Sequence, residues 1–316
     1  MNKKLWMIAG GAALIVVLLV IAIIFGVDWT TTVGICYRDT GDQIELTARQ
    51  ALEQSLMAQG YEVIVTDASG DQAMQNKMIS HLQQQNCDVL VIEPVLTAAE
   101  AELDKVISAT GIPCVLINHP LEAASELPYI GIDAAELGKV QGQMLIDLPG
   151  HGDINGDGTV CYMLIQGPEN HMDVQQQTQG IETALEACPL QTQLLTVDYG
   201  DWGQESGEQI CSRELSLFGK DIEVILCGND AMALGAAQAV TDGGWQVGQD
   251  VYLLAIGSSD ALLEQIRTGA VTGTVSWNDA AFVQKVTEAV SALAAGQKPE
   301  GQVIEGSPIT AQNVSS

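Results

Sequence analysis

Polar side chains recur in this sequence at the points where short apolar runs end. In the first half of the chain they are Arg38, Asp39, Asp42, Asp67, Asp71, Glu93, Asn118, His119 and Asp133. In the second half they are His171, Asp173, Trp202, Asn229, Asp230, Ser258, Ser259 and Asn278. Carboxylates accept hydrogen bonds, amides both donate and accept them, and tryptophan offers a flat apolar face. Such a set fits a neutral ligand with several hydroxyl groups, although Asp and Asn at strand ends also cap helices and turns.

A second candidate for chemistry is the segment 153–159, DINGDGT. It has oxygen ligands at positions 1, 3 and 5, a glycine at the sharp turn and a carbonyl at position 7, as in the first half of an EF-hand calcium loop. The residues at these positions are Asp153, Asn155, Asp157, Gly158 and Thr159. Position 12, where an EF-hand has a bidentate Glu, is Leu164. The segment therefore predicts an incomplete calcium loop, and the alternative is an ordinary turn before a strand.

Strand-like and helix-like runs alternate along most of the chain and would position these residues. The expected strands lie at 32–37, 61–66, 88–92, 114–118, 129–132, 159–165, 193–197, 223–227, 251–256, 273–276 and 303–304. The expected helices lie at 43–58, 72–85, 98–110, 138–146, 175–187, 206–218, 231–241, 261–268 and 280–295. This alternation predicts parallel sheets with helices on both faces, and the pattern restarts after residue 132. We expect two doubly wound α/β lobes whose strand ends face each other across a cleft.

Composition excludes some classes of function. A chain of 316 residues with 12 basic and 40 acidic side chains has a net charge of −28, which repels phosphate backbones and argues against nucleic-acid binding. Motifs for a nucleophile elbow, a phosphate-binding loop or a zinc protease do not occur in the sequence, so we expect no enzyme.

The seven cysteines do not form a disulfide framework in the sequence. Their number is odd, they include no Cys-x-x-Cys pair, and four lie in apolar strand-like runs where a thiol behaves as a small hydrophobic group. These four are Cys36, Cys114, Cys161 and Cys227. One bridge among Cys87, Cys188 and Cys211 stays open as an alternative.

The N-terminal region predicts a membrane anchor. Residues 5–26 form an uncharged run of 22 residues, about 33 Å as a helix, which is enough to cross a bilayer core. Lys3 and Lys4 precede it and no basic residue follows until Arg38, so the short tail 1–4 is expected in the cytoplasm and the rest outside. A cleaved signal peptide is the alternative, but the run lacks a small-x-small cleavage site.

Three stretches carry a resemblance to a known family: residues 67–102, residues 222–240 and, most specifically, residues 153–173 with the metal loop. From about Thr32 to Asn313 the chain resembles type I periplasmic solute-binding proteins of the D-galactose/D-glucose-binding group, which serve ABC sugar importers. Transcriptional repressors share this fold, but they would carry a helix-turn-helix where this chain has its apolar N-terminal run.

The resemblance implies two Rossmann-like lobes joined by three hinge crossings. We place the crossings near 131–132, 276–278 and 306–308. The N-terminal lobe would then comprise 31–131 plus 279–306, and the C-terminal lobe 132–277 plus 308–316. The protein is expected to be a monomer.

The resemblance also implies a sugar site. Residues that match the family in type and place are Asp42, Asn118, His171, Asp173, Trp202 and Asn229, and Asn278 is the match on the last crossing. Three positions depart from the family pattern. Gln177 replaces an Arg, Gly257 replaces an Asp, and Ile44 replaces a stacking aromatic residue. Losing two charge-assisted hydrogen bonds costs about 3–6 kcal/mol, so the ligand is bound weakly or differs from glucose and galactose.

Two further residues gain a meaning from the resemblance. Glu223 would supply the closing ligand of the calcium loop from a distant strand, while Cys161 stands at position 9 in place of a side-chain oxygen, which weakens the site for a hard cation. Arg38 ends the first strand and could enter the cleft beside Gln177, where it would reach hydroxyls or the carboxylate of an acidic sugar. A surface salt bridge is the alternative role for Arg38.

We therefore expect a membrane-tethered, extracytoplasmic monosaccharide-binding protein that delivers its ligand to an ABC permease and carries structural Ca²⁺. Closure of the same clamp could instead be read by a membrane histidine kinase or a chemoreceptor. A third alternative is an interaction scaffold that has lost sugar binding.

Overall fold

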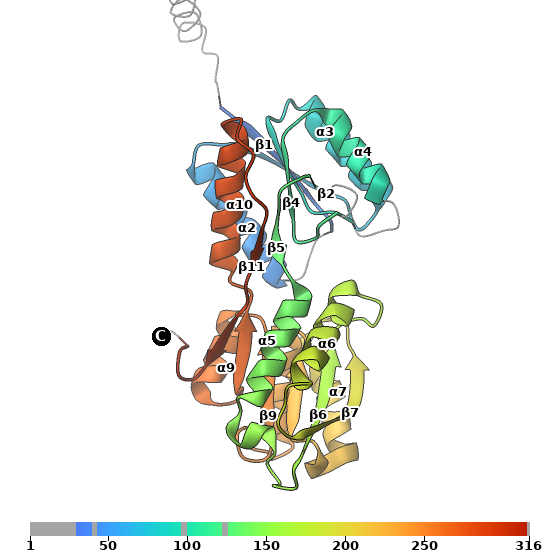
Figure 1. Cartoon of the computed structure of the whole chain (residues 1–316), viewed down its shortest axis with the longest axis vertical. Coiled ribbons are helices and arrows are strands. Elements are labelled where there is room, and N and C mark those ends of the chain that lie inside the picture. Colours follow the sequence, from blue (N-terminus) through green and yellow to red (C-terminus); the bar gives the residue numbers. More distant parts are fainter. Residues whose placement is uncertain (1–29, 40–42, 96–99, 122–125, 315–316) are drawn as a thin grey trace, which may run out of the picture.

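The chain folds into two α/β lobes stacked along the long axis of the molecule (Figure 1). The computed structural model describes residues 30–39, 43–95, 100–121 and 126–314. Each lobe is built on one sheet of six strands with helices on both faces. The predicted fold class, two Rossmann-like lobes, is confirmed.

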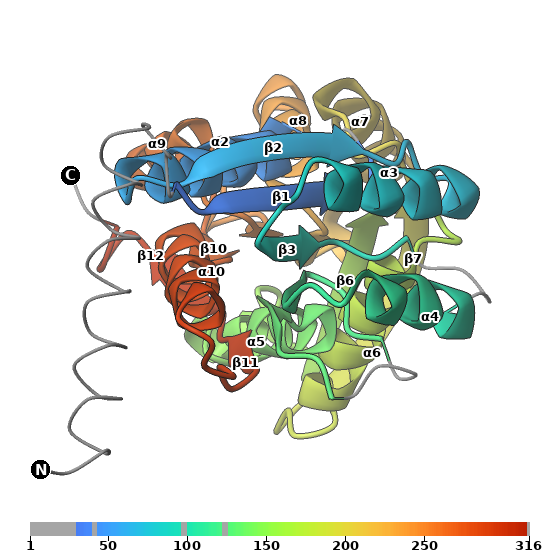
Figure 2. The same cartoon turned by 90° about the horizontal axis from the view of Figure 1, so that it is seen from above.

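The N-terminal lobe has the strand order β11-β5-β4-β3-β1-β2, with all neighbours parallel. Its strands are β1 (Thr32–Tyr37), β2 (Glu62–Asp67), β3 (Val89–Ile92), β4 (Cys114–Ile117), β5 (Tyr129–Ile132) and β11 (Gln302–Ile304). Its helices are α2 (Gln43–Ala58), α3 (Gln72–Gln84), α4 (Glu100–Thr110) and α10 (Asp279–Ala294). Helices α2 and α10 pack on one face of the sheet and α3 and α4 on the other, as Figure 2 shows from above.

The C-terminal lobe repeats this plan with the order β12-β10-β9-β8-β6-β7. Its strands are β6 (Thr159–Gln166), β7 (Gln191–Tyr199), β8 (Val224–Cys227), β9 (Tyr252–Ile256), β10 (Gly273–Ser276) and β12 (Ser307–Thr310). Its α-helices are α5 (Ala134–Ile146), α6 (Met172–Leu185), α7 (Gln204–Phe218), α8 (Asp230–Asp242) and α9 (Asp260–Thr268). Helices α5 and α6 cover one face, and α7, α8 and α9 cover the other.

Three connections join the lobes and fix where the strand ends point. The chain crosses from β5 to α5, from β10 to α10 and from β11 to β12. Since β5 runs parallel to β4, β10 runs parallel to β9, and both end at a crossing, the carboxyl ends of the parallel strands of both sheets face the opposite lobe. Ligands of open α/β sheets gather at such ends, so the fold creates a binding region between the lobes.

Local sequence explains where the structure differs from the predicted elements. Helix α5 begins at Ala134 rather than at residue 138, because the Asp133 side chain accepts hydrogen bonds from the amides of Ala135 and Glu136. Such an Asp N-cap starts a helix before its apolar periodicity begins. Strand β12 was not predicted, because its sequence, SPIT, is short and contains a proline, and it pairs with β10 in the antiparallel sense.

The structure bears on two further predictions, the membrane anchor and the state of the cysteines. The predicted anchor at 5–26 lies outside the described residues, and no helix within the described ranges is long and apolar enough to span a bilayer. All seven cysteines lie in described segments and are free thiols, so the alternative of one bridge among Cys87, Cys188 and Cys211 is not realised.

Candidate functional site

Polar side chains from four elements of the N-terminal lobe converge at its carboxyl edge. Glu93 directly follows β3, is fully buried, and accepts a hydrogen bond from Nη2 of Arg49 on α2 at 2.7 Å. Its other oxygen accepts from Nδ2 of Asn118, directly after β4, at 2.8 Å. A buried carboxylate is tolerated when it is paired and hydrogen-bonded, as it is here.

Arg38 and His119 lie at the same edge. Nη1 of Arg38 is 2.8 Å from Nε2 of His119, and Nε of Arg38 donates to Asp39 at 2.9 Å. A guanidinium can only donate, so Nε2 of His119 accepts and its proton is on Nδ1. Arg38 is thus placed in the interlobe region by two partners of its own lobe, and its side chain is 13% exposed.

Groups of both lobes act on the pKa of His119. Burial is the main cause that lowers this pKa from its ordinary 6.5, while the carboxylate of Asp173 on the opposite lobe acts in the upward direction. His171, also from the opposite lobe, and Arg38 add to the lowering. Predicted site residues from both lobes therefore share one electrostatic environment.

The C-terminal lobe contributes an aromatic and amide group to this region. Nδ1 of His171 lies 3.7 Å from Oδ2 of Asp173, and the His171 ring meets the Trp202 ring edge-on with centroids 5.7 Å apart. Nδ2 of Asn229 donates to the carbonyl of Trp202 at 2.9 Å. A β-carbon at Gly167 would overlap the Trp202 ring, so only glycine lets the indole lie against the end of β6. Contacts with Gly167 and His171 fix the Trp202 ring, as a stacking surface requires.

Three of the six non-glycine residues with positive φ in the described chain are predicted sugar residues. Asn118, Trp202 and Asn278 have φ values of 59°, 66° and 57°. Left-handed backbone is tolerable for Asn but unfavourable for a bulky residue such as Trp, and such strain persists mainly at ligand and active sites. This independent signal falls on three of the residues that the sequence had singled out.

The three departures from the family pattern have different structural settings. Gln177 on α6 is 3% exposed, and its Oε1 has no hydrogen-bond partner within the described protein. At Gly257, where φ is 128°, a β-carbon would overlap the carboxylate of Asp230, which accepts from the Ser259 amide at 2.8 Å. Asp230 thus fills the space that a side chain at 257 would need. Asp42 and the side chain of Ile44 lie outside the described residues.

The predicted calcium loop is closed by Glu223, which is 1% exposed. Oε1 of Glu223 accepts from the amides of Ile154 and Asn155 at 2.7 and 3.0 Å, and Oε2 accepts from the amide of Cys161 at 2.9 Å. Glu223, which the resemblance paired with this loop, thus lies against it, and its role as a metal ligand stays a prediction. However, in the described part of the chain no three His, Cys, Asp or Glu side chains are grouped closely enough to hold a metal ion.

The loop's own ligand candidates also bind backbone amides. Asp153 accepts from Gly156 and Gly158 at 2.6 and 2.9 Å, while Asn155 and Asp157 each accept at 2.8 Å from the amide two residues ahead. The donor set consists of hard oxygens and suits calcium in type. Its arrangement here is that of a loop organised by its own hydrogen bonds, and calcium binding stays a prediction.

The sequence placed Glu93 and His119 in the general set of polar strand-end residues without a specific role, and it gave no role to Arg49 or Gln166. A weak signal existed for Glu93, because a carboxylate at the end of an entirely apolar strand must find a partner on folding. Gln166, at the end of β6, is fully buried, and neither atom of its amide has a partner among the described residues. No sequence pattern distinguishes it from an ordinary strand-end glutamine.

Comparisons with known proteins agree with this arrangement. A family model described as a periplasmic binding protein domain matches residues 33–298. The D-galactose/methyl-galactoside binding periplasmic protein MglB of Haemophilus influenzae is 26% identical over 248 residues, which cover 76% of this chain and 74% of that protein. The ribose import binding protein RbsB of Bacillus subtilis is 21% identical over 267 residues, 84% of this chain and 83% of that protein.

A solved structure shares the fold. An ABC transporter solute binding protein from Bacillus halodurans, with bound myo-inositol, superimposes with a TM-score of 0.76 at 20% identity. The match covers 90% of this chain and 96% of that one.

Proposed function

Because this chain belongs to the periplasmic binding protein family, we propose that it binds a monosaccharide between its lobes and delivers it to an ABC sugar importer. Family membership makes the chain an extracytoplasmic solute-binding protein rather than an enzyme. The names of its relatives support a sugar as the solute: galactose for one and ribose for another.

The observation that carries this proposal is the pairing of unlike groups across the cleft. The N-terminal lobe presents Arg38, Asn118 and His119, and the C-terminal lobe presents Asp173 and Trp202 within the same electrostatic environment. Amides, a carboxylate and imidazole nitrogens bind hydroxyl groups, and the indole face packs on the C–H face of a sugar ring.

Ligand binding would act through hinge closure. A sugar that contacts both lobes stabilises the closed state by the difference in contacts between the closed and open states. The three crossings provide the hinge, because they are the connections through which the two sheets move relative to each other.

A finer feature of the proposal concerns the N-terminal segment. We propose that the apolar segment 5–26 tethers the protein to the membrane, with its two lysines on the cytoplasmic side. This tether favours a second candidate function, in which a membrane histidine kinase or chemoreceptor detects the closure of the two lobes. Copurification from detergent-solubilised membranes distinguishes an ABC permease partner from a sensor partner.

We also propose that calcium binds at the loop formed by Asp153, Asn155, Asp157, Thr159 and Glu223. Support comes from the oxygen donors and from Glu223, whose carboxylate reaches the loop from the start of β8. Since amide hydrogen bonds already fix the loop, the ion would add to a folded loop instead of creating it.

Isothermal titration of the full chain in mild detergent, against a panel of neutral monosaccharides and uronic acids, tests the proposal. At least one sugar should bind, and the variant Trp202→Ala should lose about tenfold or more in affinity because the stacking surface is gone. Trp245→Ala is the matched control, since Trp245 packs against the core of the same lobe at the far end of α8. Absence of binding for the whole panel, or equal losses in the two variants, would contradict the proposal.

A further inference from the structure

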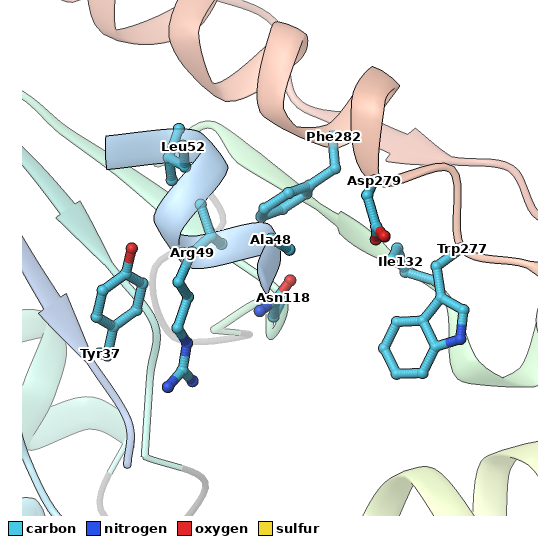
Figure 3. A pocket seen from close by; sticks show the side chains of 10 residues that line it. Tyr37, Ala48, Arg49, Leu52, Asn118, Ile132, Trp277, Asp279 and Phe282 are labelled. Atoms are coloured by element: carbon cyan, nitrogen blue, oxygen red, sulfur yellow. The ribbon is translucent and has the colours of Figure 1, made fainter. Parts of the chain in front are cut away.

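A small cavity lies beside Asn118, between helices α2 and α10 and the hinge (Figure 3). Its volume is about 30 Å³. Apolar walls come from Ala48 and Leu52 on α2 and from Phe282 on α10. An ordered water needs about 10–15 Å³ measured in the same way, so the cavity has room for a group of two or three heavy atoms.

Two polar side chains that line the cavity, Asn118 and Asp279, could form hydrogen bonds with a group inside it. Asn118 uses Nδ2 for its bond to Glu93, and Figure 3 shows its side-chain oxygen on the side of Ile132 and Asp279. Asp279, in the first turn of α10, extends its carboxyl group toward the same space (Figure 3). Burial raises the pKa of this carboxyl group above its usual range, as expected for an acid facing an apolar chamber.

The cavity shares residues with the proposed sugar site and with the hinge. Asn118 belongs to both, and Asp279 directly follows Asn278, the sugar-site candidate on the second crossing. Ile132 and Trp277, which also line the cavity, lie on the first and second crossings. A ligand group in this space would therefore touch the N-terminal lobe and two hinge connections at once.

We propose that this cavity is a subsite for the exocyclic hydroxymethyl group of a hexose, a conclusion that rests on the proposed function. The methylene group contacts Ala48 and Phe282, and the hydroxyl group donates a hydrogen bond to Asn118 or Asp279 while its oxygen can still accept one. The subsite makes the protein selective for hexoses over the pentoses that lack this group. A mostly apolar pocket with a few converging polar groups is the usual form of a small-molecule subsite.

Matched pairs of sugars isolate the hydroxymethyl group. As pyranoses, D-glucose and D-xylose, D-galactose and L-arabinose, and D-allose and D-ribose differ only by its presence. Titration calorimetry of the full chain should show that the hexose of at least one pair binds about 10- to 200-fold more tightly, the range for one group in a fitted pocket.

Two variants test whether the cavity is responsible. Ala48→Leu fills it and should bring hexose affinity down to that of the pentose while leaving pentose affinity unchanged. Asp279→Asn keeps the shape and should reduce the hexose preference severalfold. Ala51→Leu is the matched control, because Ala51 lies on the same helix but is exposed outside the cavity.

The outcomes separate this inference from the proposed function. If sugars bind but every pair shows equal affinities, or if Ala48→Leu keeps the hexose preference, the subsite is refuted and the sugar-binding function stands. If Ala48→Leu weakens pentose and hexose equally, the substitution acts on the fold and the subsite is again refuted. Binding of none of the six sugars refutes the subsite, and absence of binding for the whole panel of monosaccharides and uronic acids also refutes the sugar-binding function.

Discussion

The same corner of the two lobes is built with opposite chemistry. The two sheets have equivalent central pairs of strands: β1 lies beside β3 in the N-terminal lobe, and β6 lies beside β8 in the C-terminal lobe. The first strand of each pair is followed by a helix, α2 after β1 and α6 after β6. At this corner the N-terminal lobe has Arg49 on its helix and Glu93 after its strand. The C-terminal lobe has Gln177 on the helix and Gly228 after the strand.

The N-terminal corner is held by paired charges. Glu93 accepts from Arg49, from Asn118 and from the Arg38 amide at 3.4 Å, and the Arg49 guanidinium lies 4.4 Å from the centre of the Tyr37 ring. Each of these bonds uses a charged group, which makes it stronger than a neutral hydrogen bond. This lobe therefore presents Asn118 and Arg38 in fixed positions before any ligand arrives.

The C-terminal corner is neutral and incomplete. A β-carbon at Gly228 would overlap Oε1 of Gln166 and lie 3.3 Å from Oε1 of Gln177, so the two amides occupy the space that Glu93 occupies in the other lobe. Within the described chain, neither amide atom of Gln166 has a partner, nor does Oε1 of Gln177. Buried polar atoms without partners cost stability, so these amide atoms carry a cost that the bonded carboxylate of Glu93 does not.

The difference between the two corners depends most strongly on Glu93. The variant Glu93→Gln removes the buried counter-charge of Arg49 and leaves the more exposed Asp39 at 4.0 Å, so the free energy of unfolding should fall by about 3–5 kcal/mol. Urea unfolding measures this change. The control is Glu136→Gln, which removes an exposed pair with Lys139 and should change the free energy by less than about 1 kcal/mol. Equal losses in the two variants would show that the corner is not held by its charges.

The C-terminal lobe has a buried carboxylate of its own, which sharpens the comparison. Glu223→Gln turns an amide N–H₂ toward one or more of three backbone donors and should cost about 1–3 kcal/mol. Thermal unfolding with and without chelator measures this loss and the contribution of calcium together. If chelation of the wild type costs as much as the substitution, the metal holds the loop, and the amide bonds are secondary.

A substitution at Gln166 in the C-terminal corner should raise the free energy of unfolding instead of lowering it. Gln166→Met removes an amide whose two polar atoms have no partners and keeps a similar volume, so the protein without ligand should gain about 1 kcal/mol. The midpoint of thermal unfolding would rise by about 2–4 °C. Gln75→Met is the matched control: Gln75 is equally buried but bonds to Val95 and to the Glu93 carbonyl, so its loss should destabilise. A loss of stability in Gln166→Met would show that its amide is satisfied.

These corners also show how far the sequence could lead. Apolar runs bounded by turns predicted β1, α2, β5 and β10 with the bounds that the structure has. The types of Asn118, Trp202 and Asn278, and their positions after strands, were sufficient to propose them as ligand residues. The pairing of Arg49 with Glu93 was not accessible, because it joins residues 44 positions apart and depends on β1 and β3 being neighbours.

The cost at Gln177 was equally hidden from the sequence. A glutamine in place of an expected arginine says nothing about whether its amide finds a partner, since that depends on Gly228 and Gln166 far along the chain. Likewise, Gly257 looked like a lost carboxylate, whereas its missing side chain makes space for that of Asp230. Both facts belong to tertiary packing and not to local pattern.

The smallest expected effect is a pH dependence that only the N-terminal corner should show. His119 is neutral in the fold, since burial lowers its pKa below 6.5, and it accepts from Arg38, with Glu93, Asp173 and His171 as the other charged or titratable groups that act on it. The unfolded chain binds a proton near pH 6.5 that the native protein does not bind until lower pH, so stability is lost as the pH falls through 6.5. His119→Gln should lose less stability than the wild type between pH 7.5 and 5.5, measured by urea unfolding at both values, whereas His81→Gln, at an exposed site on α3, should follow the wild type. If His119→Gln loses more stability than the wild type between these pH values, the fold favours the charged form of His119 and the prediction is wrong.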